Sequence, residues 1–370
     1  MIRFFRSSIF FIKFLFIKKK IDVLLYAPQH FNRGNSLENE YFIPIIKALE
    51  AYNLTYIFFD EPDYVGKSAS NNNPVPFDLV YLVIIFLRRL FSSEMDMITK
   101  DQKIGRFLSK TFLRNLDFKN CIVLSQSMLS VFRGVNNNAK IFDLQHGIIH
   151  SDKNTYIKDG IPASNISCNN VNLLLYGEGF KNLLAALKDG YFHTSTFVIG
   201  TYNKMLNSAP ESNKNILVSL QFTSDHSLKQ NNLLAEELKQ IIIDNPTFSF
   251  YLKNHPRFNN EVDLTRLYEF ENVQRANSDL YSNFPKCSLH LTAYSTATFE
   301  CALLGIPTVF MQCLSDKFSM FKKDYDYPFN YSLVDEVFND YINCSSKVNN
   351  WAKFYYSDFN EDKFIKCLSL

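Results

Sequence analysis

Two hydroxyl residues and a carboxylate stand close together in residues 289–311. Ser295 and Thr296 follow a short apolar run, and Glu300 lies about one turn into the helix that is predicted to follow. The first N–H groups of a helix have no partner inside it, so a start capped by hydroxyls suits an anion such as phosphate. Glu300 would repel that phosphate and suits a sugar or ribose hydroxyl. The motif predicts a site for a nucleotide-activated compound, unless the hydroxyls only cap an ordinary helix.

Three charged or titratable side chains alternate along residues 252–257. Lys253, His255 and Arg257 end a segment with the pattern of a strand. Ligands of open α/β sheets bind at the carboxyl ends of the strands. A histidine between two cations there suits a diphosphate, and the alternative is a solvated strand end without a ligand.

A histidine precedes a glycine at the end of another predicted strand, in residues 143–150. His146 is followed by Gly147, which lets the backbone approach a ligand closely. Because the pKa of histidine lies near neutrality, we expect His146 to be a general base. His150 and Asp152 could orient it or bind an acceptor. The alternative is a turn histidine with a structural role alone.

Glu178 lies between two glycines in a predicted turn after a strand. The turn lacks the third glycine of a dinucleotide-binding fingerprint, so it is interpreted as an interdomain-facing loop. Glu178 is a possible acceptor-side residue. The acidic triplets at 94–96 and 324–326 follow no convincing buried strand. We therefore predict no metal site.

Apolar runs of strand length alternate with helical patterns, which predicts an α/β protein with a mostly parallel sheet. Strands are expected at residues 21–28, 54–60, 121–125, 139–145, 171–176, 215–221, 247–252, 272–275 and from 289. Helices are expected at residues 40–52, 231–244 and 279–286, and an apolar core segment at 77–91.

A stretch rich in Asn, Ser and Pro at residues 203–215 marks the expected domain boundary. It separates an N-terminal acceptor-side domain, residues 21–205, from a C-terminal donor-binding domain, residues 206–348. Residues 349–370 contain the only tryptophan, Trp351, and are expected to pack back across the two domains.

Residues 1–20 combine many aromatic and aliphatic side chains with six cations. The apolar run is shorter than the roughly 20 residues of a spanning helix, and no small-residue cleavage site follows it. An aromatic, basic segment is typical of an anionic membrane surface. The alternative is an ordinary first strand or helix docked on the domain.

Composition narrows the classes of function. The chain has 370 residues, 46% hydrophobic, with a formal net charge of +2. This charge does not indicate a general nucleic-acid binder, and nucleic acid is not an expected partner. The seven cysteines lack the spacing of a metal site and are expected to be buried free thiols of a cytoplasmic protein.

Three motifs together resemble a known group of enzymes. Residues 145–147 (QHG), 253–257 (KNHPR) and 292–296 (TAYST), with Glu300 and the Gly-Ile-Pro of 305–307, resemble GT-B nucleotide-sugar transferases of bacterial surface polysaccharides. CDP-glycerol glycerophosphotransferases of teichoic acid synthesis, capsule Kdo transferases and bacterial sialyl- and polysialyltransferases have similar patterns. The resemblance covers roughly residues 140–312.

The resemblance implies a GT-B fold, two Rossmann-like domains with an interdomain cleft, and no cofactor or required metal. It implies that His255 and the helix start at Ser295 and Thr296 hold the phosphates of the donor. Glu300 would face the ribose or sugar of the donor, and His146 would deprotonate the acceptor hydroxyl.

The function implied is glycosyl transfer in the synthesis of capsule, O-antigen or lipooligosaccharide. The donor would be a nucleotide sugar of CMP/CDP or UDP type, and the acceptor a glycan or lipid-linked glycan at the inner face of the plasma membrane. Ala293 stands where the glycerophosphotransferase pattern has an acidic residue, which favours sugar over polyol-phosphate transfer. The alternatives are polyol-phosphate transfer of the CDP-glycerol type, an enzyme like the UDP-sugar 2-epimerases, or an inactive membrane-associated scaffold.

Overall fold

The computed structural model divides the chain into two compact units. Unit 1 is Met1–Asn203 with Ser357–Leu370, and unit 2 is Lys204–Tyr356. The structure describes residues 2–32, 39–64, 74–91, 94–201, 210–255, 257–258, 260–277, 279–314, 319, 321–329 and 333–369.

Unit 1 is built on a seven-stranded sheet in the order β3-β2-β1-β4-β5-β8-β9, with every neighbouring pair parallel. The strands are β1 (Lys19–Pro28), β2 (Tyr56–Glu61), β3 (Val75–Pro76), β4 (Leu116–Leu124), β5 (Lys140–Leu144), β8 (Val171–Leu175) and β9 (Thr196–Val198). A small antiparallel pair consists of β6 (Ile157–Lys158) and β7 (Ile161–Pro162).

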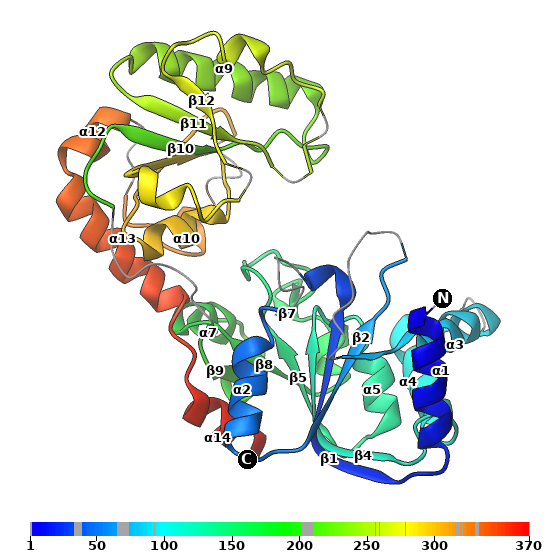
Figure 1. Ribbon diagram of the computed structural model, residues 1–370. Coiled ribbons are helices and arrows are strands. Elements are labelled where there is room, and N and C mark those ends of the chain that lie inside the picture. The colour runs from blue at the N-terminus through cyan, green and yellow to red at the C-terminus, as the bar shows by residue number, and fades with distance from the viewer. Residues whose placement is uncertain are drawn as a thin grey trace. The chain divides into compact units, whose positions relative to one another are not determined.

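Helices surround this sheet (Figure 1). They are α1 (Ile2–Phe14), the 3-10 turn η1 (Gln29–Phe31), α2 (Ile43–Ala51), α3 (Asp78–Leu90), α4 (Met97–Leu108), α5 (Leu129–Val135), α6 (Ser164–Ser167), α7 (Glu178–Ala185), α8 (Tyr191–Thr194) and α14 (Glu361–Ser369).

The side chains of alternate residues in each strand lie on opposite faces of the sheet, because successive side chains point in opposite directions. On one face Val23 and Leu25 pack with residues of α2 and α14. On the other, the ring of Tyr26 contacts Phe77 at 5.4 Å and Phe132 at 5.1 Å. The buried, nearly continuous apolar run of β1 follows from helices covering both faces.

The C-terminal segment returns to unit 1 beside β9. Thr201 bridges to Asp358, and α14 lies against α2, more than 300 residues away in the sequence (Figure 1). Gly200 makes the close approach possible: its φ is +81°, and a Cβ there would lie 2.1 Å from the carbonyl oxygen of Asp358. The expected C-terminal segment, residues 349–370, is thus divided after Tyr356.

Unit 2 contains a five-stranded parallel sheet in the order β12-β11-β10-β13-β14. The strands are β10 (Asn215–Ser219), β11 (Ser249–Lys253), β12 (Val273–Arg275), β13 (Leu289–Thr292) and β14 (Thr308–Phe310). The helices are α9 (Leu228–Asp244), α10 (Ala297–Leu303), α12 (Val334–Asn339) and α13 (Tyr341–Tyr355), with the 3-10 turns η2 (Thr265–Leu267) and η3 (Phe284–Lys286).

An aromatic cluster joins α10 to α13 within unit 2. The rings of Phe299 and Trp351 stack at 4.7 Å, and the Trp351 indole donates a 2.7 Å hydrogen bond to the carbonyl oxygen of Tyr325. Offset aromatic pairs stabilise beyond the area they bury. This contact fixes α10, the helix that carries Glu300.

The α/β architecture with parallel sheets is confirmed, and the expected strands are present with small shifts at their ends. The helix expected at residues 279–286 is wrong: the structure has only the turn η3. Pro285 cannot donate a backbone hydrogen bond and restricts the residue before it. The side chain of Asn283 instead ties the loop together through Asn277 N and Asp279 O. The apolar segment 77–91 forms α3, which buries only one face.

The N-terminal segment is a docked helix followed by the start of β1, which begins at Lys19. Arg3 reaches into unit 1, with Nη1 2.7 Å from Asp60 Oδ2 and Nη2 3.0 Å from Asp78 Oδ2. Phe11 is fully buried against Phe59 and Phe77. Among the described residues, no helix is long and apolar enough to cross a bilayer. Helix α1 is therefore part of the unit 1 fold.

All seven cysteines are free. The expectation of buried thiols is confirmed for five of them, but Cys168 is exposed and Cys313 is half-buried. Cys168 directly follows the short helix α6 and occupies its C-cap, which places it at the surface.

Replacing Arg3 should destabilise unit 1. In Arg3→Met, Asp60 and Asp78 keep their buried carboxylates and lose their shared cation, so the free energy of unfolding should fall by about 3 kcal/mol. Urea denaturation followed by circular dichroism measures the change.

The matched control is Lys119→Met, which removes a cation from the exposed pair with Asp22. Exposed pairs contribute under about 1 kcal/mol. Equal losses in the two variants would contradict a structural role for the Arg3 pairs.

Candidate functional site

The strand order of unit 2 locates one crevice for a ligand. The chain runs from β10 outward to β11 and β12, then returns to the other side of β10 as β13 and β14. The order therefore reverses between β10 and β13. In open α/β sheets ligands bind outside the carboxyl ends of the strands at this switch point. The loops that follow β10 and β13 are thus the walls of the candidate site.

A hydrogen bond joins these two loops. The hydroxyl of Tyr294, after β13, meets Nε2 of His226, after β10. Nδ1 of His226 lies 3.2 Å from Oδ1 of Asn231, whose amide nitrogen donates to Thr223 O, so we infer that Nδ1 carries the proton and Nε2 accepts from Tyr294. Burial, with Asp225 adding to it, raises the pKa of Tyr294 to about 12, so the phenol stays protonated.

The basic loop after β11 lies at the same edge of the sheet. Lys253 ends the strand and is half-buried, as is His255. Nδ1 of His255 accepts a 3.1 Å hydrogen bond from the backbone N–H of Arg257, which leaves Nε2 for a ligand. Burial, Arg257 and Lys253 lower the pKa of His255, although Asp225 opposes them. The guanidinium of Arg257 pairs with Asp225 at 2.6 Å, so a phosphate would share that cation with an acid.

The two hydroxyls expected at a helix start are found there, with Thr296 as the N-cap of α10. Ser295 Oγ accepts from the N–H of Ala297 at 3.2 Å, and Thr296 is exposed. The helix ends as expected, with Gly305 in the left-handed region at φ +71°. One of the free N–H groups is therefore already capped by Ser295.

Glu300 lies in the first turn of α10, as the spacing predicts. Its side chain is partly covered as a whole, but Oε2 is enclosed and has no hydrogen-bond partner among the described residues. Burial raises the pKa of this carboxyl to about 7. A buried unsatisfied oxygen calls for an explanation, and a hydroxyl group of a bound ligand would supply the missing donor.

In unit 1, His146 follows β5 at the carboxyl edge of the sheet. Its ring packs edge-on against Phe31 at 5.3 Å, and its carbonyl oxygen accepts from the Tyr41 hydroxyl at 3.2 Å. Nδ1 is buried without a partner among the described residues. Burial, with Lys153 and His30 adding to it, lowers the pKa of His146 to about 4. The sequence-based value near neutrality is wrong for this environment.

The loop that carries His146 is held by buried polar residues. Gln145 donates to Gly147 O at 2.8 Å and accepts from the N–H of Tyr176 at 2.9 Å. No atom of the described residues lies within 4 Å of the position that a Cβ on Gly147 would occupy. The loop is therefore fixed at Gln145 and open at Gly147, as an approach by a ligand requires.

Asp143 anchors a second loop at this edge. It accepts hydrogen bonds from the Tyr156 hydroxyl at 2.8 Å and from Gln126 N at 3.2 Å. Ser125 and Gln126 both have left-handed backbones, with φ of 63° and 62°. Such strain in non-glycine residues concentrates at functional sites. This loop follows β4, which is the neighbour of β1 across the unit 1 switch point.

The other candidate acceptor-side residues are less enclosed. His150 is half-buried, and Asp152 is exposed on the same loop as His146. Glu178 is the first residue of α7, after β8, and is exposed. All three lie in unit 1, while the expected donor residues lie in unit 2. The expected cleft between the units and the roles of these residues stay predictions.

Sequence reasoning found the loop after β13 through Ser295 and Thr296, but it missed other residues of the loops at the two switch points. His226, Asp225 and Tyr294 in unit 2 were not singled out, nor was Glu61 in unit 1, which accepts from Ser127 at 3.1 Å and from Tyr26. The order of the strands in each sheet would have identified these residues, but that order is known only from the folded structure. The one signal in the sequence was their place just after apolar runs.

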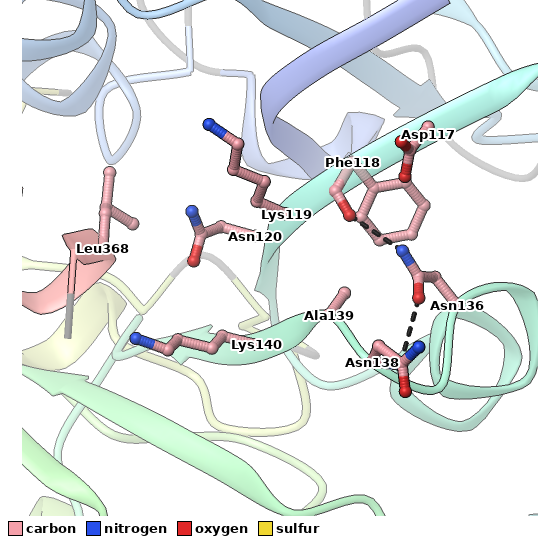
Figure 2. Close-up of a pocket in the computed structure, with 9 residues that line it drawn as sticks. All are labelled: Asp117, Phe118, Lys119, Asn120, Asn136, Asn138, Ala139, Lys140 and Leu368. Carbon is pink, nitrogen blue, oxygen red and sulfur yellow. Dashed lines mark hydrogen bonds between the residues drawn. The ribbon is translucent and has the colours of Figure 1, made fainter.

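A hollow of about 420 Å³ lies at the opposite, amino-terminal edge of the unit 1 sheet. Figure 2 shows Asn120 of β4 beside Lys140 of β5, with Leu368 of α14 facing them and Lys119 next to Asn120 on β4. Parallel sheets do not bind their ligands at this edge, and no residue predicted from the sequence lines it. We do not assign it to the candidate site.

Sequence comparison finds no relative: no family model matches the chain, and no curated protein sequence does. Solved structures do resemble it. A UDP-GlcNAc 2-epimerase from Methanocaldococcus jannaschii is 13% identical, with 95% of this chain and 99% of that one covered and a TM-score of 0.53. The wall teichoic acid polymerase TagF is 12% identical, with 100% and 97% covered and a TM-score of 0.53.

The fold is GT-B. A third structure, Staphylococcus aureus MnaA with UDP, is 11% identical over 93% of this chain and 95% of that chain, with a TM-score of 0.52. At these identities the likeness establishes the fold, and it spans nearly the full length of both proteins in each pair. The two parallel sheets are thus the two Rossmann-like domains of the GT-B architecture.

Asp143 should make stability depend on pH. In the unfolded chain this carboxyl ionises near pH 4, whereas burial keeps it protonated up to about pH 7 in the folded protein. The folded state binds the extra proton between these values, so the contribution of Asp143 to the free energy of unfolding is full below pH 4 and lost as pH rises to 7. Urea denaturation at a series of pH values measures it.

Asp143→Asn removes this titration. The stability of the variant relative to the parent should therefore rise between pH 4 and 7, by roughly 1.4 kcal/mol per unit of pKa shift. Asp152→Asn, on an exposed carboxylate of the same unit, is the control. Parallel curves for parent and Asp143→Asn would show that Asp143 is ionised throughout.

Proposed function

We propose that the protein is a glycosyltransferase that moves a sugar from a nucleotide-activated donor to a growing surface glycan. The donor binds at the switch point of unit 2, and unit 1 holds the acceptor. No metal takes part in the proposed reaction. The acceptor is a glycan or lipid-linked glycan of capsule, O-antigen or lipooligosaccharide type.

One observation carries this proposal: two cations, two histidines, two hydroxyls and an enclosed carboxyl lie around one switch point. Lys253 ends β11 and His255 follows it, while Ser295 follows β13; the His226–Tyr294 hydrogen bond joins the loops after β10 and β13. Charge-assisted hydrogen bonds to phosphate are shorter and about twice as strong as neutral ones. This grouping suits a diphosphate, and the open Oε2 of Glu300 suits a ribose or sugar hydroxyl next to it.

The structural relatives support a nucleotide ligand. MnaA was solved together with UDP, and another TagF structure, of TM-score 0.51, was soaked with CDPG. Because the neighbours include epimerases and a teichoic acid polymerase, sugar epimerisation and polyol-phosphate transfer are the competing reactions. Ala293 stands at the position where the glycerophosphotransferase pattern is acidic, which favours sugar transfer.

His146 is the proposed base for the acceptor hydroxyl. With its pKa lowered to about 4, its ring is neutral at pH 7 and has a nitrogen free to take a proton. Burial also makes the ring a weaker base, because it disfavours the charged imidazolium that forms when the ring takes a proton. Catalysis therefore requires the reacting complex to stabilise that charge, and the negative charge of the donor would do so.

Thermal unfolding with CMP, CDP, UDP, GDP and TDP tests whether a nucleotide binds. A ligand that binds only the folded state stabilises it by about 2.7 kcal/mol at 100 times its Kd. Incubating the sugar form of the stabilising nucleotide without acceptor then separates the reactions. Epimerisation without acceptor, or transfer of a polyol phosphate, would replace glycosyl transfer as the function.

His255→Ala should weaken donor binding without unfolding the protein. Its Nε2 is the expected phosphate contact, and losing a charge-assisted bond costs roughly 1.5–3 kcal/mol, which is about tenfold or more in Kd. Nucleotide titration by calorimetry gives the value. His193→Ala, at an exposed position on α8, is the control. A Kd unchanged from the parent would remove His255 from the site.

His146→Ala should lower turnover roughly 10²–10⁴-fold with the donor Kd nearly unchanged. In the parent, the acid limb of kcat/KM should lie near pH 4, where the free protein protonates His146, and not near 6.5. Lost donor affinity with turnover retained at saturation would make His146 a phosphate ligand. The base would then be sought among His150, Asp152 and Glu178.

A further inference from the structure

The outward face of α1 carries an unbroken apolar stripe. Phe5, Ile9 and Ile12 are 65%, 40% and 53% exposed, and Phe16, just after the helix, is 79% exposed. Their spacing of four, three and four residues places them along one side of the helix. The opposite side faces unit 1 through Ser7, Phe11 and Phe14, which are buried. The stripe is therefore not needed for folding.

Helix α3 continues the same surface. It packs beside α1 (Figure 1), and Leu79 N donates to Ser7 Oγ at 3.0 Å. Its own outward residues, Leu82, Phe86 and Leu90, recur every four positions and are 43%, 60% and 65% exposed. Two neighbouring helices thus present apolar side chains to solvent over several turns each. Exposed apolar area of this extent marks an interaction site.

The charges on these helices have one sign. Residues 2–20 contain no Asp or Glu, and the one acid of α3, Asp78, is buried against Arg3. Lys13, Lys18 and Arg89 are exposed at the ends of the two helices. The partner of this surface must therefore be apolar and negatively charged.

We propose that α1 and α3 dock the protein on an anionic lipid bilayer, with the apolar stripes at the level of the acyl chains and the lysines among the headgroups. Helix α1, of 13 residues, is too short to span and is tied to the protein by Arg3, so it lies along the surface. This docking does not depend on the proposed reaction, and it can be tested by binding alone.

A second copy of the chain is the competing occupant. Symmetric pairing through this face would set two surfaces that each carry Lys13, Lys18 and Arg89 against each other, with no exposed acid on either helix to offset them. Anionic headgroups supply that charge, and each basic residue near them is attracted. Charge complementarity therefore favours the bilayer over a dimer.

The test is binding of the full chain to vesicles of phosphatidylcholine with and without phosphatidylglycerol, measured by flotation. Removal of the whole segment is unsuitable because it takes Arg3 away from Asp60 and exposes the core around Phe11. Substitutions on the stripe avoid this. F5Q/I9Q/I12Q should weaken binding about 100-fold and L82Q/F86Q about tenfold, with the urea midpoint unchanged in both.

I342Q is the matched control, because Ile342 is 85% exposed on α13 of unit 2. It should bind like the parent. K13Q/K18Q should lose roughly tenfold or more on anionic vesicles and little on neutral ones. The proposal is overturned if the parent protein does not bind anionic vesicles. It is also overturned if F5Q/I9Q/I12Q binds them as strongly as the parent does. A dimer of the parent that F5Q/I9Q/I12Q dissociates, with no lipid binding, overturns it in favour of a second copy.

Discussion

Parallel pairing is the constraint on which the rest of the structure depends. Each strand of the two large sheets runs in the same direction as its neighbours, so each must be followed by a crossover, and all the strands of a sheet end at one edge. Polar loops can gather at that edge without breaking the ladder. The reversal of strand order then singles out one crevice per sheet, between β1 and β4 and between β10 and β13. Two of the buried polar atoms that have no hydrogen-bond partner among the described residues, His146 Nδ1 and Glu300 Oε2, lie in a loop or a first turn at these edges.

The sequence predicted what local pattern determines. Apolar runs such as residues 171–176 and 215–221 are strands because both faces of a parallel sheet are covered. The sequence predicted that α10 starts at Ser295 and Thr296 and ends at Gly305, because helix capping depends on residues that are close in the sequence. The resemblance in residues 140–312 was enough to expect a GT-B fold, although the solved structures with that fold share only 11–13% identity with the chain.

What the sequence did not predict depends on neighbours that are distant in the chain. The pKa of His146 is lowered to about 4 because protein covers the ring and because the charges of Lys153 and His30 are near it in the fold. The hydrogen bond that Tyr294 donates to His226 joins residues 68 positions apart. Residues 1–20 posed a different difficulty: a helix that lies on a membrane and a helix docked on its own domain have the same composition, and α1 has one buried side and one exposed apolar side. Periodicity indicates an amphipathic helix, but not which side meets protein.

The return of the chain to unit 1 sets the order in which that unit can be completed during synthesis. Phe364, Cys367 and Leu368 of α14 belong to the same core cluster as Val23 and Ile45, and Gly200 receives the backbone of Asp358. A ribosome that adds about 5–20 residues per second makes the roughly 150 residues of unit 2 in about 8–30 s. For that interval the face of the sheet beside α2 lacks its last helix. The nascent chain therefore shows an open apolar surface to chaperones until α14 leaves the exit tunnel.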